Sequence, residues 1–463
     1  MRSFFSETKT PFTLFVLALL GHLVFFYALL SFYGPCSFFL SNDCTLNGND
    51  TQHYVIDAFN LTHGHGYSRF VNAPFEPDAL RTPLLPLYFA PFTFFGGYSL
   101  IWLAILLLNI VLSLAAVVAY KLARFFLPHG FALAAGFFMA FEPLYLYRSQ
   151  IAEPDALFVL LVLVSSFFIV RSWRRGFAPD MFRAALFLGL AVLAKPTALY
   201  IALIMFFFEI CYLLFFQKST YIEKGKTFLI SLCIMGAVVS PWVIRNELVF
   251  GVPALSSIQG YNLYEYYTKD LGSPAEPVPE AIEKGSREPS RYLPFQSYFT
   301  HAAFARIEAH PNAFMRELLV GSLRNLFVSD ISSIFYYGHT KLLPFRYDPE
   351  SAVDIHQLLL SGNLRAFFAA LFSPHALTKL LWIVCLVCIY ILACIGWGMS
   401  WFKERKVFLS FTMFLCLYGY LIFASGPYVD AKYRLPALTL IFIVALYGLQ
   451  SILPASFLRG ARK

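Results

Sequence analysis

Charged side chains are scarce in this sequence, because Asp, Glu, Lys and Arg together make up only 13% of its 463 residues. A soluble domain usually carries about 25% charged residues, and it could not hide the 59% of hydrophobic residues found here. A basic tract long enough to bind a polynucleotide is also lacking, although Lys and Arg outnumber Asp and Glu by 35 to 27. These shortages exclude a soluble protein and a nucleic-acid-binding protein, and they predict an integral membrane protein.

A cleavable leader is not indicated by the start of the sequence. The first apolar run, 11–33, is longer than the about 7–15 residues of a signal-peptide core, and no A-x-A-like cleavage site follows it. We therefore expect this run to be retained as a membrane anchor.

Cysteines are few, and six of the eight fall inside apolar runs, where a buried thiol is the ordinary outcome. Cys36 and Cys44 differ, because both follow the first run and precede Asp50. In an oxidising compartment these two residues could be bridged or could remain free thiols. The spacing leaves both alternatives open.

Apolar runs are abundant, and ten of them are candidates to cross the membrane, which takes about 20 residues. The runs are 11–33, 98–122, 131–147, 155–171, 182–195, 198–216, 227–244, 377–402, 407–424 and 435–453. The fifth run is short and could join the sixth through a break at Lys195-Pro196. We predict an all-α polytopic membrane protein with about ten transmembrane helices, forming one module over 1–453, and a basic cytoplasmic tail over 454–463.

Lysine and arginine gather in the short connections on one side of the predicted bundle, for example at Arg174, Arg175 and Lys406. The positive-inside rule places these connections and both termini in the cytoplasm. Two long segments, 34–97 and 245–376, then lie outside. The amphipathic stretch 313–336 within the second segment is expected to rest on the membrane surface, as is the proline-punctuated piece RTPLLPLYFAPFTFFGG within the first.

Several charged residues lie at the outer ends of the runs, where the orientation rule gives no reason for them. The cations are Arg81, Arg148, Lys195, Arg245, Lys432 and Arg434, and the acids are Asp50, Asp57, Glu153, Asp155 and Asp430. Interface anchors and ion pairs would explain any single one of them. Cations at this depth can also bind a lipid-linked phosphate, and a carboxylate beside them can take a proton from a hydroxyl group. A phosphate stabilised by cations leaves without a separate acid, so the set favours glycosyl transfer from a polyprenyl-phosphate sugar.

The motifs that carry these charges resemble a known family and occur in its order. They are GNDTQHY (48–54), RTPLLPLY (81–88), QIAEPDALF (150–158), LAKPTALY (193–200), SPWVIRNELVFG (240–251), GYNLYEYY (260–267), FARIEAHP (304–311) and DAKYRLPAL (430–438). Over about residues 1–450 the chain resembles the GT-C glycosyltransferases, in the family-39-like branch that contains protein O-mannosyltransferases and lipid A aminoarabinose transferases. Two departures are the Thr51 that follows Asp50, where some relatives have an Asp-Glu pair, and Lys195, where many bacterial relatives have arginine.

The resemblance implies an inverting transferase without a cofactor, active on the outer side of a bacterial cell membrane. Its partners would be a polyprenyl-phosphate sugar and a lipid, glycan or protein acceptor. Asp50 would be the catalytic base, with Asp57 or Asp43 as alternatives. The implied ligands of the donor phosphate are Arg81, Lys195, Arg245, Lys432 and Arg434. The implied lining of the sugar or acceptor pocket is Tyr54, Asp57, Glu153, Asp155, Tyr261, Asn262 and Tyr264.

Histidines are concentrated directly after the proposed base, at His53, His63 and His65, and with Asp50 they could supply metal ligands. Gly64 and Gly66 on either side of His65 favour a turn instead, and we predict no metal. Two other classes of function stay open. A secondary transporter would use buried acids such as Glu142 and Glu209, and an envelope assembly protein would use the loop 270–290.

Overall fold

The computed structural model describes residues 2–33, 50–176, 178–216, 221–269, 271, 278–328 and 374–454. Cys36, Cys44, Asp43 and most of the basic tail lie outside these residues. Both alternatives for the two cysteines therefore stay open, and one alternative base and the tail stay predictions.

Helices account for the predicted runs, and eight segments of the described chain are long and apolar enough to cross a membrane. The bundle consists of α1 (Arg2–Tyr33), α4 (Ile101–Ala123), α5 (His129–Phe141), α6 (Pro143–Arg148), α7 (Asp155–Arg175), α8 (Ala178–Ala194), α9 (Ala198–Phe216), α10 (Tyr221–Phe250), α18 (Pro374–Lys403), α19 (Arg405–Ala424) and α20 (Leu435–Ile452). Helices α5 and α8, with 13 and 17 residues, are the short members. The prediction of an all-α polytopic membrane protein is confirmed.

Close helix packing holds the C-terminal part of the bundle together. Helices α18 and α20 approach so closely at Gly396 and Gly448 that a Cβ at either position would clash with backbone atoms of the facing helix. Small residues at such crossings let two membrane helices come into van der Waals contact. This packing fixes α20, whose N-terminal end carries Lys432 and Arg434.

A buried polar network fastens α1 to the segment that follows α6. The imidazole Nδ1 of His22 lies 3.0 Å from the hydroxyl of Ser149, which donates to the amide oxygen of Asn109 at 2.9 Å. Gln150 donates to the same amide oxygen at 2.6 Å. Because Ser149 follows Arg148 directly, the network positions the end of α6, which carries Arg148, and the loop that carries Glu153.

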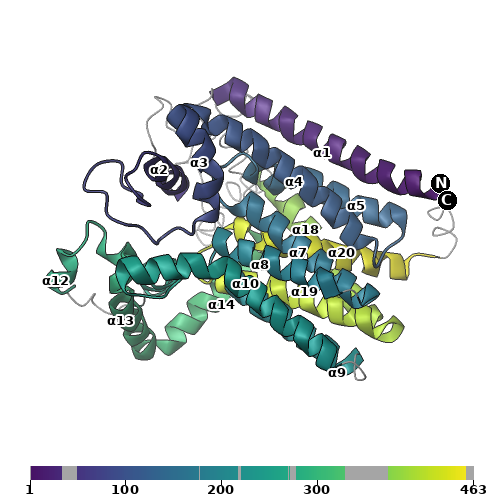
Figure 1. The fold of residues 1–463 in the computed structure, drawn as a ribbon. Coiled ribbons are helices and arrows are strands. Elements are labelled where there is room, and N and C mark those ends of the chain that lie inside the picture. The colour runs from purple at the N-terminus through teal and green to yellow at the C-terminus, as the bar shows by residue number, and fades with distance from the viewer. Residues whose placement is uncertain are drawn as a thin grey trace, which may run out of the picture.

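The two ends of the bundle differ in the helices that lie at them. Helix α1 begins and α20 ends at one end, while the remaining described helices gather at the other (Figure 1). These outer helices are α2 (Asp50–Thr62), α3 (Leu84–Gly96), α11 (Ile258–Asn262), η2 (Leu263–Tyr267), α12 (Glu280–Glu283), α13 (Gln296–Ala309) and α14 (Pro311–Phe327). Helix α3 runs across the end of the bundle, as expected for a segment at the interface. The end opposite to this one carries ion pairs such as Arg174–Glu404.

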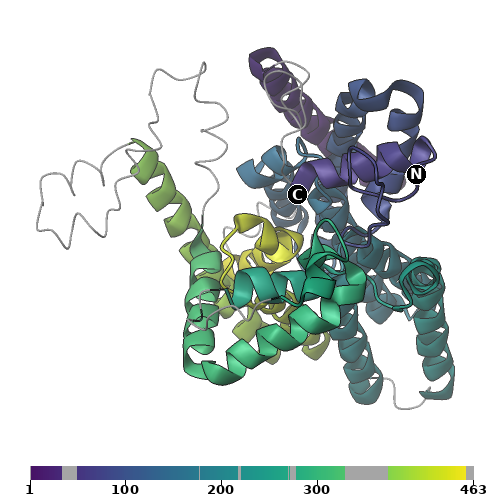
Figure 2. The ribbon, with the colours of Figure 1, turned by 90° about the vertical axis from the view of Figure 1, so that its left-hand side faces the viewer.

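The amphipathic stretch predicted over 313–336 corresponds to α14 as far as the structure describes it. Residues 329–336 lie outside the described residues. Its apolar side chains Met315, Leu319 and Leu323 are exposed, whereas Gly321 and Asn325 are buried against the rest of the protein. Figure 2 looks onto this end and shows α13 and α14 crossing it beside the C-terminal helices. The helix therefore presents one apolar face outward and one contact face inward.

Candidate active site

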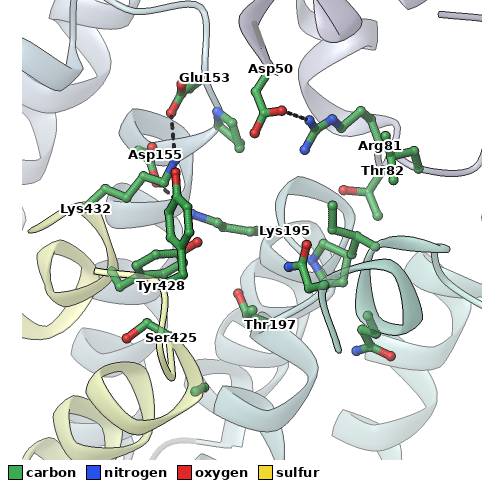
Figure 3. A pocket seen from close by; sticks show the side chains of 18 of the residues that line it. Asp50, Arg81, Thr82, Glu153, Asp155, Lys195, Thr197, Ser425, Tyr428 and Lys432 are labelled. Carbon is green, nitrogen blue, oxygen red and sulfur yellow. Dashed lines mark hydrogen bonds and ion pairs between the residues drawn. The ribbon is translucent and has the colours of Figure 1, made fainter. Parts of the chain in front are cut away.

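An open pocket lies at the outer end, where α7 begins, α8 ends and η6 (Ala431–Arg434) leads into α20. It contains about 1030 Å³ of space not filled by atoms, part of it open to solvent. Its lining includes Asp50, Tyr54, Arg81, Thr82, Glu153, Asp155, Lys195, Thr197, Gln259, Asn262, Tyr266, Tyr267, Ser425, Tyr428, Lys432 and Tyr433. Figure 3 shows Asp50 and Arg81 on one side, Glu153, Asp155 and Lys432 on the other, and Lys195 between them.

One side of the pocket is built around Asp50, the first residue of α2. The guanidinium of Arg81 forms an ion pair with its carboxylate. Arg81 also lies 3.1 Å from the Nδ1 of His53 and stacks over the ring of Tyr54, with 5.1 Å from its Cζ to the ring centroid. The side chain of Arg81 is 8% exposed and that of Asp50 is 56% exposed. A buried cation therefore holds an exposed carboxylate at the pocket.

The charges around the pocket also determine the protonation states of Asp50 and His53. Burial raises the pKa of Asp50, but the positive charges of Arg81 and Lys432 more than offset it, so the pKa lies below its usual range. Burial and the charge of Arg81 lower the pKa of His53 to about 4. At neutral pH Asp50 is thus an anion and His53 is uncharged, so the Nδ1 of His53 is free to accept from Arg81.

The opposite side of the pocket is organised by Arg148, the last residue of α6. Its guanidinium is 3.1 Å from Glu153, 3.1 Å from Asp430 and 3.9 Å from Asp155. Buried arginine suits this task, because its planar fork of donors can serve several carboxylates at once. The sequence placed Arg148 at an outer end but did not assign it to the site; the signal was a lone cation directly after an apolar run.

Two lysines complete this side. The Lys195 ammonium is 2.9 Å from Asp155, while that of Lys432 is 3.7 Å from Glu153 and 3.4 Å from Asp430. The contacts of Lys432 are longer than ordinary hydrogen bonds of about 2.7–3.2 Å. Because an ammonium carries three N–H donors, both lysines can bind an incoming anion without leaving their carboxylates.

Tyrosines near the pocket differ from those predicted. Tyr266 and Tyr267 line it, whereas Tyr261 accepts from Arg291 at 2.9 Å and Tyr264 packs on Phe299 with ring centroids 4.9 Å apart. The reason is local, because Leu263–Tyr267 is a π-helix, whose wider turn changes which side chains share a face. Tyr261 and Tyr264 are therefore not among the residues that line this pocket, whereas the predicted Tyr54 and Asn262 are.

Three further predicted residues are not brought to the pocket. Arg245 donates to the backbone oxygen of Asp78 at 2.7 Å and stacks over Trp242, with 4.9 Å from its Cζ to the ring centroid. Arg434 is 1% exposed and donates to the backbone oxygen of Asn325 at 3.1 Å. Asp57 is fully buried on the inner face of α2, where burial and the charge of Asp78 raise its pKa well above its usual range. Arg245 and Arg434 contact other parts of the protein in this geometry, and the roles predicted for all three residues stay predictions.

The buried acids that a transporter would need also have structural partners. Glu142 is the N-cap of α6 and accepts from the backbone N–H of Tyr145 at 3.0 Å. Glu209 accepts from the indole N–H of Trp173 at 2.5 Å. Neither residue lines the pocket.

His63 and His65 lie in the turn that follows α2, whereas His53 lies within that helix. Gly64 and Gly66 adopt φ of 80° and 76°, a left-handed conformation that suits glycine. His63 stacks on Phe59 and His65 on Phe75, with ring centroids 3.8 and 4.1 Å apart. Within the described residues, no group of three or more His, Cys, Asp or Glu side chains is placed to hold a metal ion.

The loop that carries Tyr428 and Asp430 is held by α14. The amide nitrogen of Asn325 donates to the hydroxyl of Ser425 at 2.6 Å and to the backbone oxygen of Tyr428 at 3.2 Å. Its amide oxygen accepts from the backbone N–H of Asp430 at 3.0 Å. One turn earlier, Gly321 packs directly on the backbone of the same loop. Helix α14 therefore positions one wall of the pocket.

We expect Gly321→Ala to destabilise the protein by about 1–3 kcal/mol, the usual cost of overpacking. The added methyl group would clash with the backbone oxygen of Gly426, which cannot move aside as a flexible side chain could. Thermal unfolding of the purified protein in detergent measures the effect. The control is Gly419→Ala in α19, where nothing lies within 4 Å of the new Cβ and alanine should be neutral or stabilising by up to about 1 kcal/mol. Equal stability of the two variants would contradict the packing described here.

Comparisons with known proteins agree with this architecture. Residues 81–244 match the family model described as dolichyl-phosphate-mannose-protein mannosyltransferase. No curated protein matches the chain significantly. The Archaeoglobus fulgidus oligosaccharyltransferase in complex with Zn and sulfate has a similar fold, with a TM-score of 0.50 at 14% identity, over 97% of this chain and 50% of that one.

The same archaeal enzyme tethered to an acceptor peptide containing the NVT sequon gives a TM-score of 0.50 at 14% identity, over 98% of this chain and 51% of that one. ArnT from Cupriavidus metallidurans bound to undecaprenyl phosphate covers 94% of this chain and 77% of that one at 12% identity, but its TM-score of 0.38 is too low to carry an argument. Identities this low show the fold alone, and the chain spans about half the length of the archaeal enzyme. The family model and the shared fold together confirm the resemblance to GT-C glycosyltransferases that the sequence motifs indicated.

Proposed function

We propose that this protein is an inverting glycosyltransferase that moves a sugar from a polyprenyl-phosphate donor to an acceptor on the outer side of the membrane, with Asp50 as the general base. The observation that carries the proposal is the pocket itself, in which an exposed, ionised carboxylate shares one open space with Lys195 and Lys432. The description of the matching family, which includes a dolichyl-phosphate sugar, supports a donor of this class.

The proposed reaction uses the two sides of the pocket separately. Asp50 accepts the proton of the acceptor hydroxyl as its oxygen bonds to the anomeric carbon. The bond between that carbon and the phosphate oxygen breaks on the opposite face, which inverts the anomeric configuration. Polyprenyl phosphate leaves with the electron pair, and its charge is stabilised by the ammonium groups of Lys195 and Lys432.

Arg81 has a different role in this proposal from the phosphate binding that the sequence predicted. Its guanidinium is already paired with Asp50 and His53. We therefore assign Arg81 to positioning the base and keeping it ionised. Arg148 acts in the same way on the other side, because it holds Glu153 and Asp430 near Lys432.

The location of the pocket supports outward-facing chemistry. Helix α2, which carries Asp50, lies at the end of the bundle opposite to the start of α1 (Figure 1), and the positive-inside rule places that start in the cytoplasm. We propose a bacterial cell membrane as the site and a single membrane module over 1–453 as the working unit.

The test is a panel of labelled polyprenyl-phosphate sugars offered to the purified protein in liposomes with membrane extract as the acceptor source. We expect one donor to lose its label to an acceptor or, more slowly, to water, with polyprenyl phosphate as the other product. The anomeric configuration of the product reports inversion. If no donor of the panel is consumed, or if the configuration is retained, the proposed function or its inverting mechanism is wrong.

A further inference from the structure

We infer that the exposed rings of Tyr266 and Tyr428 form a stacking platform for a saccharide, and that the acceptor of the reaction is therefore a glycan or a glycolipid headgroup and not a protein side chain. The inference rests on the proposed function, because it assigns the acceptor class of the same pocket. Below, the term tyrosine platform means the side chains of Tyr266 and Tyr428.

The tyrosine platform is exposed where a bound ligand could cover it. Tyr266 is 45% and Tyr428 41% exposed, and both line the pocket. Their ring centroids are 5.3 Å apart with an interplanar angle of 66°. Two rings in this edge-to-face arrangement form an angled surface and leave part of each face uncovered. Large aromatic groups gain by burial, so a ligand that covered both rings would be stabilised by them.

The two rings come from separate parts of the chain, and neighbouring residues hold each of them in position. Tyr266 belongs to the π-helix Leu263–Tyr267, a rare element that is frequent at functional sites. Tyr261 packs on its outer side, with ring centroids 5.7 Å apart and planes at 90°. The backbone of Tyr428 is held by Asn325. The platform is thus built by the long outer segment and the start of the last span together.

Saccharide chemistry fits the groups around the platform. The C–H groups on one face of a sugar ring are apolar and weakly positive, so they stack on the electron-rich face of an aromatic ring, while the ring's hydroxyl groups need scattered donors and acceptors. The pocket supplies these as side-chain hydroxyls and amides of Thr82, Thr197, Gln259, Asn262 and Ser425. A peptide bound in an extended form would require unpaired backbone groups for its main chain. Tyr266 lies in the consecutive helical segments Ile258–Asn262 and Leu263–Tyr267, whose backbone groups are largely used within the helices.

The groups proposed to bind the donor phosphate are more deeply buried in the pocket than the proposed base, which acts on the acceptor. Lys195 and Lys432 are 19% and 13% exposed, whereas Asp50 is 56% exposed. The phosphate-binding groups thus form the floor of the pocket, and the proposed base lies at its rim with the tyrosine platform. The negative charge of Asp50 acts on both phenols, being one of the smaller causes that raise the pKa of Tyr266 and of Tyr428. A sugar stacked on the platform would present its hydroxyl group to Asp50.

The experiment compares Tyr266→Ala and Tyr428→Ala with the wild type and with Tyr266→Phe and Tyr428→Phe. The exposed Tyr27 on α1 provides the control Tyr27→Ala. Two rates are measured with the donor that the wild type consumes, namely hydrolysis in water and transfer to short oligosaccharides or to serine- and threonine-containing peptides. The hydrolysis rate reports the donor site without any acceptor.

We expect each alanine variant to raise the KM for the oligosaccharide acceptor about tenfold, since about 1.4 kcal/mol of lost stacking is a factor of ten. Hydrolysis should stay within about twofold, and the phenylalanine and Tyr27 variants should behave like the wild type. Peptide acceptance with a KM insensitive to the variants overturns the inference, as does an equal loss of hydrolysis and transfer, which would assign the rings to the donor sugar. A wild type that neither hydrolyses nor transfers any donor overturns the proposed function and this inference with it.

Discussion

Asp50→Asn lowers the rate of sugar transfer about 10²–10⁴-fold, which is the usual contribution of a general base. The amide has nearly the shape of the carboxylate and still accepts a hydrogen bond from Arg81, but it cannot take the proton of the acceptor hydroxyl. Donor binding should change little, because Lys195 and Lys432, the proposed ligands of the phosphate, are other lining residues of the pocket. Single-turnover transfer in liposomes and a separate donor-binding titration measure the two quantities.

The pH dependence of sugar transfer tests the assignment of Asp50 as the base in the wild-type protein. Because Arg81 and Lys432 hold the pKa of Asp50 below its usual range, the base is ionised throughout the neutral range. Its protonation can reduce transfer only as the pH falls through that lowered pKa, below about 3.9. A loss of transfer centred between pH 5 and 7, with the protein still folded, would point to a different base.

Two matched variants address the alternative bases. Asp57→Asn changes the same side-chain type on the same helix, but Asp57 is fully buried and does not line the pocket. Asp43→Asn tests the acid that lies outside the described residues. We expect both to retain transfer within about tenfold of the wild type after correction for folded protein, well short of the loss of a base. If either variant loses transfer while Asp50→Asn keeps it, the base has been assigned to the wrong residue.

The membrane architecture could be predicted from the sequence because it depends on length and hydropathy. A run such as 155–171 must be a helix in the bilayer, since no other single segment satisfies its own backbone there, and α7 spans Asp155–Arg175. The same reasoning placed Asp50, Arg81, Lys195 and Lys432 at one end of the bundle. In the structure these four residues line one pocket.

Side-chain direction could not be predicted in the same way, because it depends on local helix geometry. Within GYNLYEYY, a π-helix brings Tyr266 and Tyr267 to the pocket in place of Tyr261 and Tyr264. In DAKYRLPAL, Lys432 and Arg434 are two residues apart in a 3-10 helix. They therefore point in different directions, and only Lys432 reaches the pocket.

Residues in irregular loops escaped prediction for a further reason. Tyr428 lies between the last two spans in a loop without periodicity, and its position depends on Asn325, about a hundred residues earlier in the chain. A contact between segments so far apart leaves no mark in one sequence.

Arg148 carried a weak signal, its charge, but the three carboxylates around it come from the loop before α7, the first residue of α7 and the loop before α20.

Lys195→Met lowers kcat for transfer about 10²-fold, the usual cost of removing one group that stabilises developing charge. The ammonium of Lys195 projects into the pocket (Figure 3) from the end of α8, where Asp155 anchors it at 2.9 Å. The phosphate gains charge as the glycosidic bond breaks, so the lost interaction is stronger in the transition state than with the bound donor. We therefore expect a larger change in kcat than in the donor KM, measured with saturating acceptor.

Two further substitutions, one at Lys195 and one at Lys403, separate the loss of positive charge in the pocket from a general effect on folding. Lys195→Arg keeps the positive charge beside Asp155 and should keep transfer within about tenfold, because an arginine fork can pair with a carboxylate and a phosphate alike. Lys403→Met makes the same change at the opposite end of the bundle, where the side chain donates to Ser451 at 3.0 Å, and it should leave kcat unchanged. If Lys195→Met instead lowers the thermal stability while its folded fraction transfers sugar at the wild-type rate, Lys195 serves only to neutralise the buried Asp155, and the leaving phosphate must be stabilised by Lys432 or by another group.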